Sequence, residues 1–218
     1  MWKLVDCRAE LRLEGVEGAV NLAEPASGVA NVCIERHLVA HRLLGVGGDD
    51  ETTAADWPIA DAYVRGRDLV VVYGPTPARP FTVEVYWSVV DEPRARLALE
   101  VVVSVQTELL ECHPQFSVSS LVPAQAHSER AIVANQPRPL AIVPATRNWS
   151  LAELAPRADF PPAEVALEAI GIATRWRLEQ EFMEKGVIRR VRVRALMLPA
   201  DDAVTLAEES CDALGAES

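Results

Sequence analysis

The feature that most constrains this chain is the strict alternation of apolar and polar residues along residues 81–89. Every odd position there carries an apolar side chain, and the even positions carry Thr, Glu, Tyr and Ser. Because successive side chains of a strand point to opposite faces of a sheet, this alternation predicts a half-buried β-strand. Residues 97–105 repeat the pattern after a polar turn that contains a proline. We therefore predict a β-hairpin in which Trp87 lies opposite Leu99.

Similar signals recur along most of the chain. Residues 59–64 and 69–73 flank a polar turn at residues 65–68, whose glycine can adopt the positive φ that tight hairpin turns need. Many of the fifteen prolines separate further short strand segments, because proline cannot donate a hydrogen bond to a central ladder. About a dozen strands at spacings of about 8–15 residues are typical of a sandwich or barrel. We predict a single all-β domain over residues 1–198, a large antiparallel two-sheet sandwich.

The end of the chain changes character at residue 199. Asp201 and Asp202 favour a helix start, because acidic side chains near a helix N-terminus interact well with the helix dipole. Residues 199–218 contain six acidic residues and no Lys or Arg. We predict a short acidic C-terminal helix or tail, which is either solvated or docked to a basic protein partner.

Charge and targeting signals narrow the classes of protein. The formal net charge is −11 at pH 7, which disfavours binding to the phosphate backbone of nucleic acids. The first residues hold no apolar segment of a signal peptide, and no apolar run is long enough for a membrane span. The four cysteines are too scattered for a metal or redox motif. We expect a cytoplasmic protein with reduced thiols and no membrane association.

Motifs for metals and cofactors are weak in this chain. His37 and His41 have the spacing of a helical metal-binding pair, but on a strand they would lie about 13 Å apart. The glycine-rich turn at residues 45–48 is followed by three acidic residues that would repel a phosphate group. We predict neither a bound metal nor a cofactor.

Residues 174–198 contain two alternating segments on either side of Lys185 and Gly186. A hairpin closed at this turn has one charge-paired face and one mainly apolar face. Its register places Arg177 directly opposite Arg194, and like charges in that position repel each other. We predict that an acidic side chain from another strand, or a bound anion such as a sugar acid, lies within reach of both guanidinium groups, unless both extend into water. The two arginines are therefore candidate ligand-binding residues.

Residues 182–190, with the sequence Phe-Met-Glu-Lys-Gly-Val-Ile-Arg-Arg, resemble a hairpin of uncharacterised bacterial β-sandwich proteins of the galactose-mutarotase-like supersandwich class. The resemblance implies a large two-sheet antiparallel sandwich with a sugar-binding face. It assigns no active site, because the catalytic His and carboxylate of that class match no motif of this chain.

Few side chains stand out as candidates for function. His113 and His127 are candidates for acid–base catalysis, and Glu129 shares a strand face with the second of them. Trp57 and Trp149 lie at loop-like positions, where each either stacks on a ring-shaped ligand or packs under a loop.

These features leave three functional hypotheses. The first is a non-catalytic binding module for a carbohydrate or a small anionic ligand. The second is an enzyme similar to aldose epimerases that uses a His–carboxylate pair. The third is a structural or assembly protein that docks through its acidic tail. Because the chain carries no catalytic signature, we favour the binding module over the enzyme, although fold analogy alone is weakly diagnostic of function.

Overall fold

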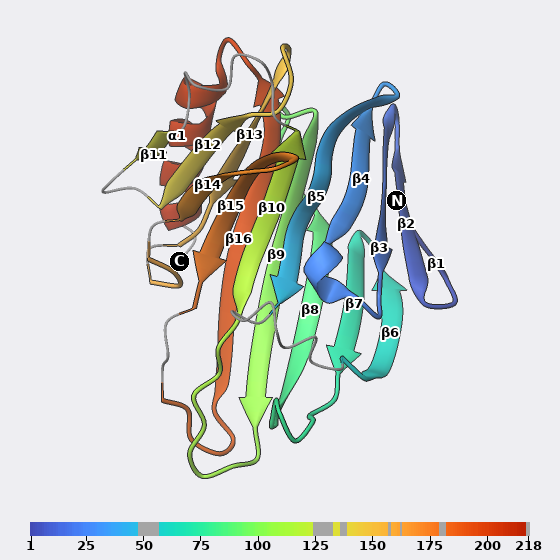
Figure 1. The fold of residues 1–218 in the computed structure, drawn as a ribbon, viewed down its shortest axis with the longest axis vertical. Coiled ribbons are helices and arrows are strands. Elements are labelled where there is room, and N and C mark those ends of the chain that lie inside the picture. Colours follow the sequence, from blue (N-terminus) through green and yellow to red (C-terminus); the bar gives the residue numbers. More distant parts are fainter. Residues whose placement is uncertain are drawn as a thin grey trace.

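The computed structural model describes residues 1–47, 57–123, 133–135, 139–156, 158–161, 163–178 and 182–216. Within these ranges the chain forms two antiparallel sheets of eight strands each, packed face to face, and one α-helix (Figure 1). This architecture confirms the predicted all-β, two-sheet antiparallel sandwich with a short C-terminal helix.

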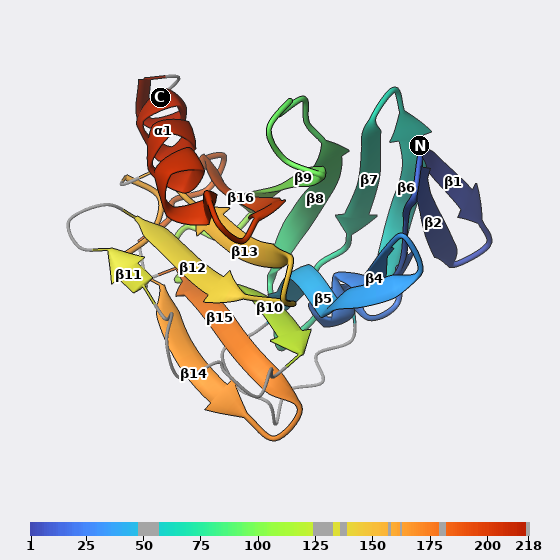
Figure 2. The ribbon, with the colours of Figure 1, turned by 90° about the horizontal axis from the view of Figure 1, so that it is seen from above.

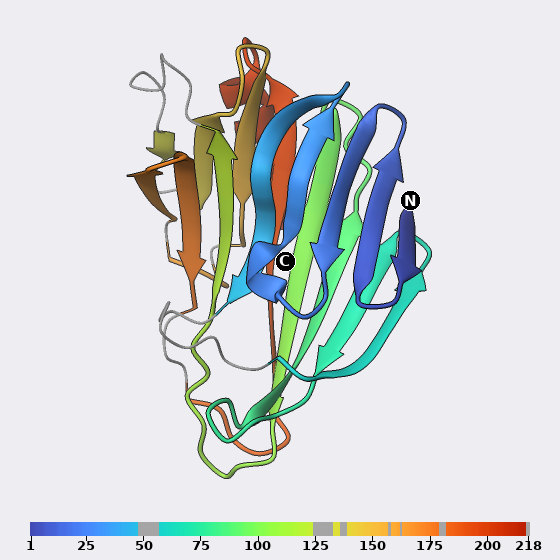
Figure 3. The ribbon, with the colours of Figure 1, turned by 45° about the vertical axis from the view of Figure 1, so that its right-hand side comes forward.

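Each sheet combines strands from distant parts of the sequence. Sheet A has the order β1 (Trp2–Val5), β2 (Arg8–Leu13), β3 (Val16–Asn21), β4 (Val29–Ile34), β5 (His37–Gly47), β10 (Ser117–Pro123), β15 (Gly171–Arg177) and β14 (Glu164–Glu168). Sheet B has the order β11 (Val133–Asn135), β12 (Leu140–Pro144), β13 (Trp149–Leu154), β16 (Ile188–Pro199), β9 (Leu97–Thr107), β8 (Phe81–Val89), β7 (Asp68–Tyr73) and β6 (Ile59–Arg65). A 3-10 turn, Pro25–Ser27, precedes β4. At one side of the sandwich β1 lies beside β6 (Figure 3).

The predicted hairpin of residues 81–105 is present as β8 and β9, but its register differs by two residues. Trp87 lies opposite Val101 rather than Leu99. A shift of two residues keeps every side chain on the same face of the sheet, so alternation alone cannot distinguish the two registers. The predicted hairpin of residues 59–73 is confirmed, and its turn residue Gly66 has a φ of 61°.

The predicted hairpin of residues 174–198 is wrong. Strand β15 lies in sheet A between β10 and β14, whereas β16 lies in sheet B between β9 and β13. The predicted turn itself exists: the Val187 N–H donates to the Glu184 carbonyl (3.1 Å), and Gly186 has a φ of 81°. The chain passes from one sheet to the other between the two strands. Their apolar faces therefore meet across the core instead of pairing edge to edge.

The main apolar core lies between the two sheets. It contains both tryptophans that the alternation assigns to the interior, Trp87 from sheet B and Trp176 from sheet A, and each is 0% exposed. Burial of a large apolar side chain stabilises a fold by about 1.5–3 kcal/mol. The inward-facing residues of β8, β9 and β16 fill much of the same space.

A second apolar cluster lies between the outer face of sheet B and the helix α1 (Ala203–Ala216). The helix contributes Ala203, Ala207 and Cys211, whose spacing of four residues places them on one helical face. Figure 2 shows α1 on the outer side of sheet B, where its main contacts are with β12, β13 and β16. Glu209 of this acidic helix forms an ion pair with Arg94 of the β8–β9 loop. No helix in the described part of the chain is long and apolar enough to cross a membrane.

A carboxylate lies at the centre of the sandwich. Glu153 on β13 is 0% exposed, and it accepts hydrogen bonds from the hydroxyl of Ser120 and from the Trp176 indole (2.9 Å), both in sheet A. The Ser120 oxygen accepts a bond from the Leu44 N–H (2.9 Å), and the Leu44 carbonyl accepts one from the Trp87 indole (2.9 Å). This chain of polar contacts joins the two sheets through their apolar core.

Burial raises the pKa of Glu153 above its ordinary value, because a charged carboxylate is poorly solvated there. The hydrogen bonds from Ser120 and Trp176 act in the opposite direction. The Thr174 hydroxyl is also close enough to lower the pKa, although it forms no hydrogen bond of ordinary geometry. Glu153 is not among the residues predicted from the sequence, where its one signal is a glutamate inside the otherwise apolar run of residues 151–155.

Candidate functional site

The outer face of sheet B carries rows of side chains, because the strand register brings every second residue of neighbouring strands together. The central row contains Arg192, Val102, Tyr86, Val70 and Tyr63, one from each of β16, β9, β8, β7 and β6. The two flanking rows contain Arg190, Ser104 and Glu84 on one side and Arg194, Glu100 and Ser88 on the other. Charged, hydroxyl and aromatic groups therefore gather on one sheet face.

A groove of about 380 Å³ lies where β9 and β16 meet the segment that follows β13. It is lined by Glu100, Val102, Pro156, Ala158, Asp159, Arg190, Val191 and Arg192. Its volume lies within the range of about 300–1,000 Å³ that is typical of small-molecule sites.

The segment after β13 closes one side of the groove. Strand β13 ends at Leu154, so the edge of β16 beyond it needs other partners. The Asp159 carboxylate accepts a hydrogen bond from the backbone N–H of Arg192 (3.0 Å), and the Ala158 carbonyl accepts one from the Arg189 guanidinium (3.1 Å). These two bonds hold the segment against β16 and give the groove its wall.

Two arginines of β16 differ in what they contact. Arg194 donates to Glu100 through Nε (3.0 Å) and Nη2 (2.8 Å), and both side chains are largely buried. Arg190 is exposed, and its Nε donates to the Ser104 hydroxyl (3.0 Å). Among the described residues Arg190 has no carboxylate partner. Its remaining N–H groups have no partner in the described part of the chain, so they are candidates to bind a ligand in the groove.

Two tyrosines extend the site across sheet B. Tyr86 is half-buried and Tyr63 is 36% exposed, and they flank Val70, which is 0% exposed on this outer face. Burial and the neighbouring Glu84 carboxylate raise the pKa of Tyr86. Its phenol is protonated at neutral pH, as that of any ordinary tyrosine is. The guanidinium of Arg65 lies 6.0 Å from the centre of the Tyr86 ring. An aromatic surface therefore adjoins the groove.

The two arginines that the sequence places opposite each other lie in different sheets. Arg177 on β15 lies beside Glu164 of β14, with 3.3 Å between Nε and Oε2. Arg194 on β16 pairs with Glu100 of β9. The prediction that Arg177 and Arg194 face each other is wrong, because the two strands do not form the predicted hairpin. Each arginine does lie beside a carboxylate from a neighbouring strand, but the two share none.

Trp57 stacks on a side chain of the protein itself. The Arg79 guanidinium lies 4.3 Å from the centre of the indole, and the Tyr73 ring packs edge-on against it at 5.0 Å. Arg79 is 6% exposed and donates to the carbonyls of Phe81 (3.0 Å) and Gly74 (2.8 Å). Burial lowers the pKa of Arg79. Arg79 and Tyr73 therefore already occupy places at which a ligand could stack on Trp57.

The histidine candidates are only partly described. His113 lies in the loop after β9, with its Nε2 3.5 Å from a Glu111 carboxylate oxygen and its ring 5.8 Å from the Phe182 ring. This pair is exposed and does not border the groove. His127 and Glu129 lie outside the described residues.

Three further side chains were singled out from the sequence. Trp149 begins β13 and is half-buried against the main core. His37 and His41 both lie on β5, an extended strand. Within the described ranges no group of three or more His, Cys, Asp or Glu side chains could hold a metal ion.

The sequence pattern does not predict the groove, although it does predict the sheet face of two of its residues. Arg190 and Arg192 alternate with valines and were assigned to a polar sheet face, as the structure places them. The predicted hairpin puts both arginines on its charge-paired face, but it offers no view of strands beyond the hairpin. Only the long-range pairing of β16 with β9 brings Ser104 and Val102 beside these arginines.

Comparison with known proteins places the chain by its fold. No protein-family model matches it, and no curated protein is detectably similar to it in sequence. Its structure is similar to that of a mutant of the heparan sulfate lyase HepC from Pedobacter heparinus, with a TM-score of 0.51 and 9% identity over 85% of this chain and 33% of that one. A heparinase III matches with a TM-score of 0.43 and 9% identity over 71% of this chain and 23% of that one. This chain therefore spans at most a third of these proteins, and the similarity shows the fold alone.

Proposed function

We propose that this chain binds carbohydrate along the groove of sheet B and the adjoining tyrosines. The observation that carries the proposal is the groove itself, which has a volume of about 380 Å³ and is lined by Arg190, whose outer N–H groups have no partner among the described residues. Tyr86 and Tyr63 continue this surface over β8 and β6.

The chemistry of a sugar ring fits these groups. Its hydroxyls can accept hydrogen bonds from the Arg190 guanidinium and from the phenols, and they can donate to carboxylates such as Glu84. Its aliphatic C–H face can pack on an aromatic ring, because tyrosine supplies a rigid amphipathic surface at a low entropy cost. A flat sheet face with polar and aromatic side chains in register can accommodate several sugar units in a row.

The structural comparison supports the same class of ligand. The similar protein with the higher TM-score is named as a heparan sulfate lyase, which acts on a polysaccharide. Because the match covers a third of that protein, the proposal concerns carbohydrate binding and does not extend to the lyase reaction.

Affinity electrophoresis and isothermal titration calorimetry test the proposal. The probes are heparan sulfate, chondroitin sulfate, and oligosaccharides of neutral α- and β-glucans. We expect one of these classes to bind the wild-type chain, and Tyr86→Ala and Arg190→Ala each to weaken that binding at least tenfold, because each removes a contact that no neighbouring side chain replaces.

The matched control is Arg177→Ala, which removes the same charge from sheet A and should leave the affinity within about twofold, since its loss concerns only an exposed ion pair. Absence of binding to all four probe classes would contradict the proposed function. Binding that survives both groove variants would contradict the proposed location.

A further inference from the structure

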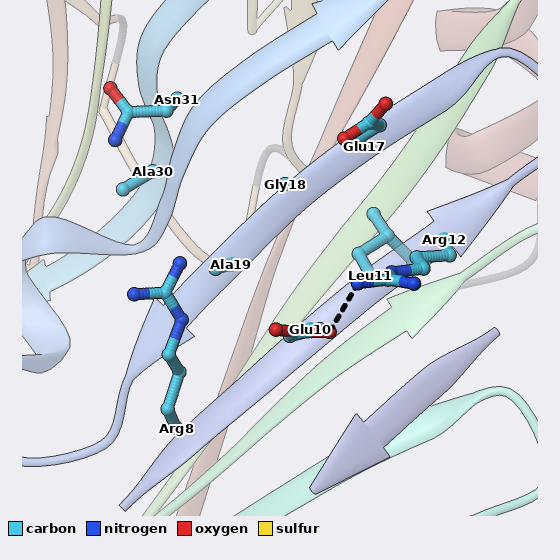
Figure 4. A pocket seen from close by; sticks show the side chains of 9 residues that line it. All are labelled: Arg8, Glu10, Leu11, Arg12, Glu17, Gly18, Ala19, Ala30 and Asn31. Carbon is cyan, nitrogen blue, oxygen red and sulfur yellow. Dashed lines mark hydrogen bonds and ion pairs between the residues drawn. The ribbon is translucent and has the colours of Figure 1, made fainter. Parts of the chain in front are cut away.

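A second hollow lies on the outer face of sheet A, on the side of the sandwich opposite the groove. It has a volume of about 220 Å³ and is formed by β2, β3 and β4. Figure 4 shows its lining residues: Arg8, Glu10, Leu11, Arg12, Glu17, Gly18, Ala19, Ala30 and Asn31.

The hollow exists because the residues at its base have small side chains. Ala19 pairs with Ala30 across β3 and β4, and Gly18 precedes this pair. The ladder shifts by one residue next to them, and Asn31 there has a φ of 51°, which asparagine tolerates better than most residues. The exposed Asn31 side chain lies next to Ala30 at one edge of the hollow (Figure 4).

Some of the polar side chains that line the hollow have partners within the protein, and others have none among the described residues. Glu10 and Arg12 neutralise each other through an ion pair of 2.9 Å. Among the described residues, the side chains of Arg8, Asn31 and Glu17 have no hydrogen bond or ion pair. Figure 4 shows the Arg8 guanidinium reaching over β3 towards Ala19, on the same side as Asn31. Glu17 lies at the far end, opposite Arg12 in the ladder.

We propose that this hollow binds a small hydroxylated carboxylate, such as a sugar acid. The planar guanidinium of Arg8 forms two parallel bonds to a carboxylate, and the Asn31 amide adds a third donor at the same end. At the opposite end the Glu17 carboxylate accepts hydrogen bonds from ligand hydroxyls and repels a second anionic group. The volume limits the ligand to about one sugar ring, since it lies below that of most drug-sized sites.

The proposal does not depend on the function proposed for sheet B, because the two sites share no residue. It also gives a ligand partner to Arg8, an arginine that contacts no hydrogen-bond or ion-pair partner among the described residues. A ligand with a carboxylate at the Arg8 end and no anionic group at the Glu17 end matches this arrangement.

Amide chemical shifts of the full chain, followed by NMR during titration with D-glucuronate, test the proposal. We expect shifts confined to residues of β2, β3 and β4, and affinity at least tenfold weaker for D-glucose, which lacks the carboxylate. Arg8→Ala should weaken glucuronate binding at least tenfold. Arg8→Lys should bind glucuronate more tightly than Arg8→Ala but more weakly than the wild type. Lysine keeps the positive charge but lacks the planar guanidinium that forms two parallel hydrogen bonds.

Arg177→Ala, which removes the same charge elsewhere in sheet A, is the matched control and should bind glucuronate as the wild type does. Acetate that binds as tightly as glucuronate would overturn the role given to Glu17. No shifts at any concentration up to tens of millimolar would overturn the site. Shifts confined to Arg190 and Tyr86 would overturn this proposal while leaving the proposed function of sheet B intact.

Discussion

Two charged side chains are buried in this protein without an oppositely charged partner among the described residues, and they are held in different ways. Glu153, at the centre of the sandwich, accepts hydrogen bonds from side chains of the opposite sheet. Arg79, at one end of sheet B, donates to the carbonyls of Gly74 in its own loop and of Phe81 at the start of β8, and it stacks on Trp57. Glu153 therefore joins the two sheets, whereas Arg79 joins the β7–β8 loop to the start of β8 and to Trp57, which precedes β6.

Glu153 and Arg79 show two ways in which a protein can reduce the free-energy cost of burying an ionisable group. An uncompensated ion in a protein interior is costly unless its hydrogen-bonding groups are satisfied or it becomes neutral. Burial shifts both pKa values towards the neutral form, raising that of Glu153 and lowering that of Arg79. Only the carboxyl can lose its charge in the ordinary pH range, because an arginine stays protonated in proteins. The stability conferred by Glu153 should therefore depend on pH, and that of Arg79 should not.

The largest effect is expected from Glu153→Ala, which removes the acceptor from the Trp176 indole and leaves a cavity between the sheets. We expect a loss of about 3 kcal/mol in the free energy of unfolding, measured by urea denaturation. Glu164→Ala is the control, since that side chain is exposed and its loss should cost less than about 1 kcal/mol. A similar small cost at both positions would mean that the central polar chain does not hold the sheets together.

Arg79→Leu should have the next largest effect. The variant keeps an apolar side chain against Trp57 but loses two charge-assisted bonds to carbonyls, and we expect a loss of about 2 kcal/mol. Arg79→Lys should lie between the wild type and the leucine variant, because lysine cannot reach both carbonyls with one planar group. If the Arg79→Leu variant is as stable as the wild type, the loop needs only apolar packing against Trp57.

Glu153→Gln tests whether the free energy of unfolding depends on pH through Glu153. Because its pKa is raised, the folded protein keeps a proton that an unfolded glutamate loses above a pKa of about 4.3. Between the unfolded and the folded pKa the wild type should lose stability relative to the permanently neutral glutamine variant, by up to about 1.4 kcal/mol per pH unit. Urea unfolding of both proteins from pH 4 to pH 8 measures this. Parallel curves would mean that Glu153 does not change its protonation state in this range.

The smallest effect is expected from Tyr73→Phe, which tests whether the cluster around Arg79 also links the sheets. The Tyr73 hydroxyl donates to the Leu22 carbonyl (2.9 Å), which lies just beyond the end of β3 in sheet A. Its loss should cost about 1 kcal/mol in thermal or urea unfolding. If Tyr73→Phe lowers the free energy of unfolding as much as Glu153→Ala does, the cluster around Arg79 also links the two sheets, and the contrast with Glu153 does not hold.

The fold could be predicted from sequence because its signals are local. Alternation along residues 81–89 and the glycine turn at residues 65–68 report directly on strands and hairpins. Alternation also assigns a side chain to a face, and Trp87, Trp176 and Arg190 follow that assignment.

The pairing of distant strands could not be predicted in the same way. Pairing β15 with β16 in one sheet gives coherent faces, yet so does placing them in opposite sheets with their apolar faces towards each other. The candidate site depends on that choice, since Arg190 meets Ser104 only through the pairing of β16 with β9. Both surface hollows arise from such non-local contacts or from small residues at a ladder irregularity, neither of which leaves a periodic signal.

The position of β16 has a consequence for how the protein is made. It is the last strand in chain order, yet it occupies the middle of sheet B between β9 and β13. About 80 residues separate the end of β9 from the start of β16, and a ribosome that adds about 5–20 residues per second takes several seconds to supply them. During that interval the valine-rich edge of β9 has no strand beside it. The nascent chain therefore passes through a stage in which this apolar strand edge is exposed, and a chaperone that covers the edge would increase the yield of folded protein.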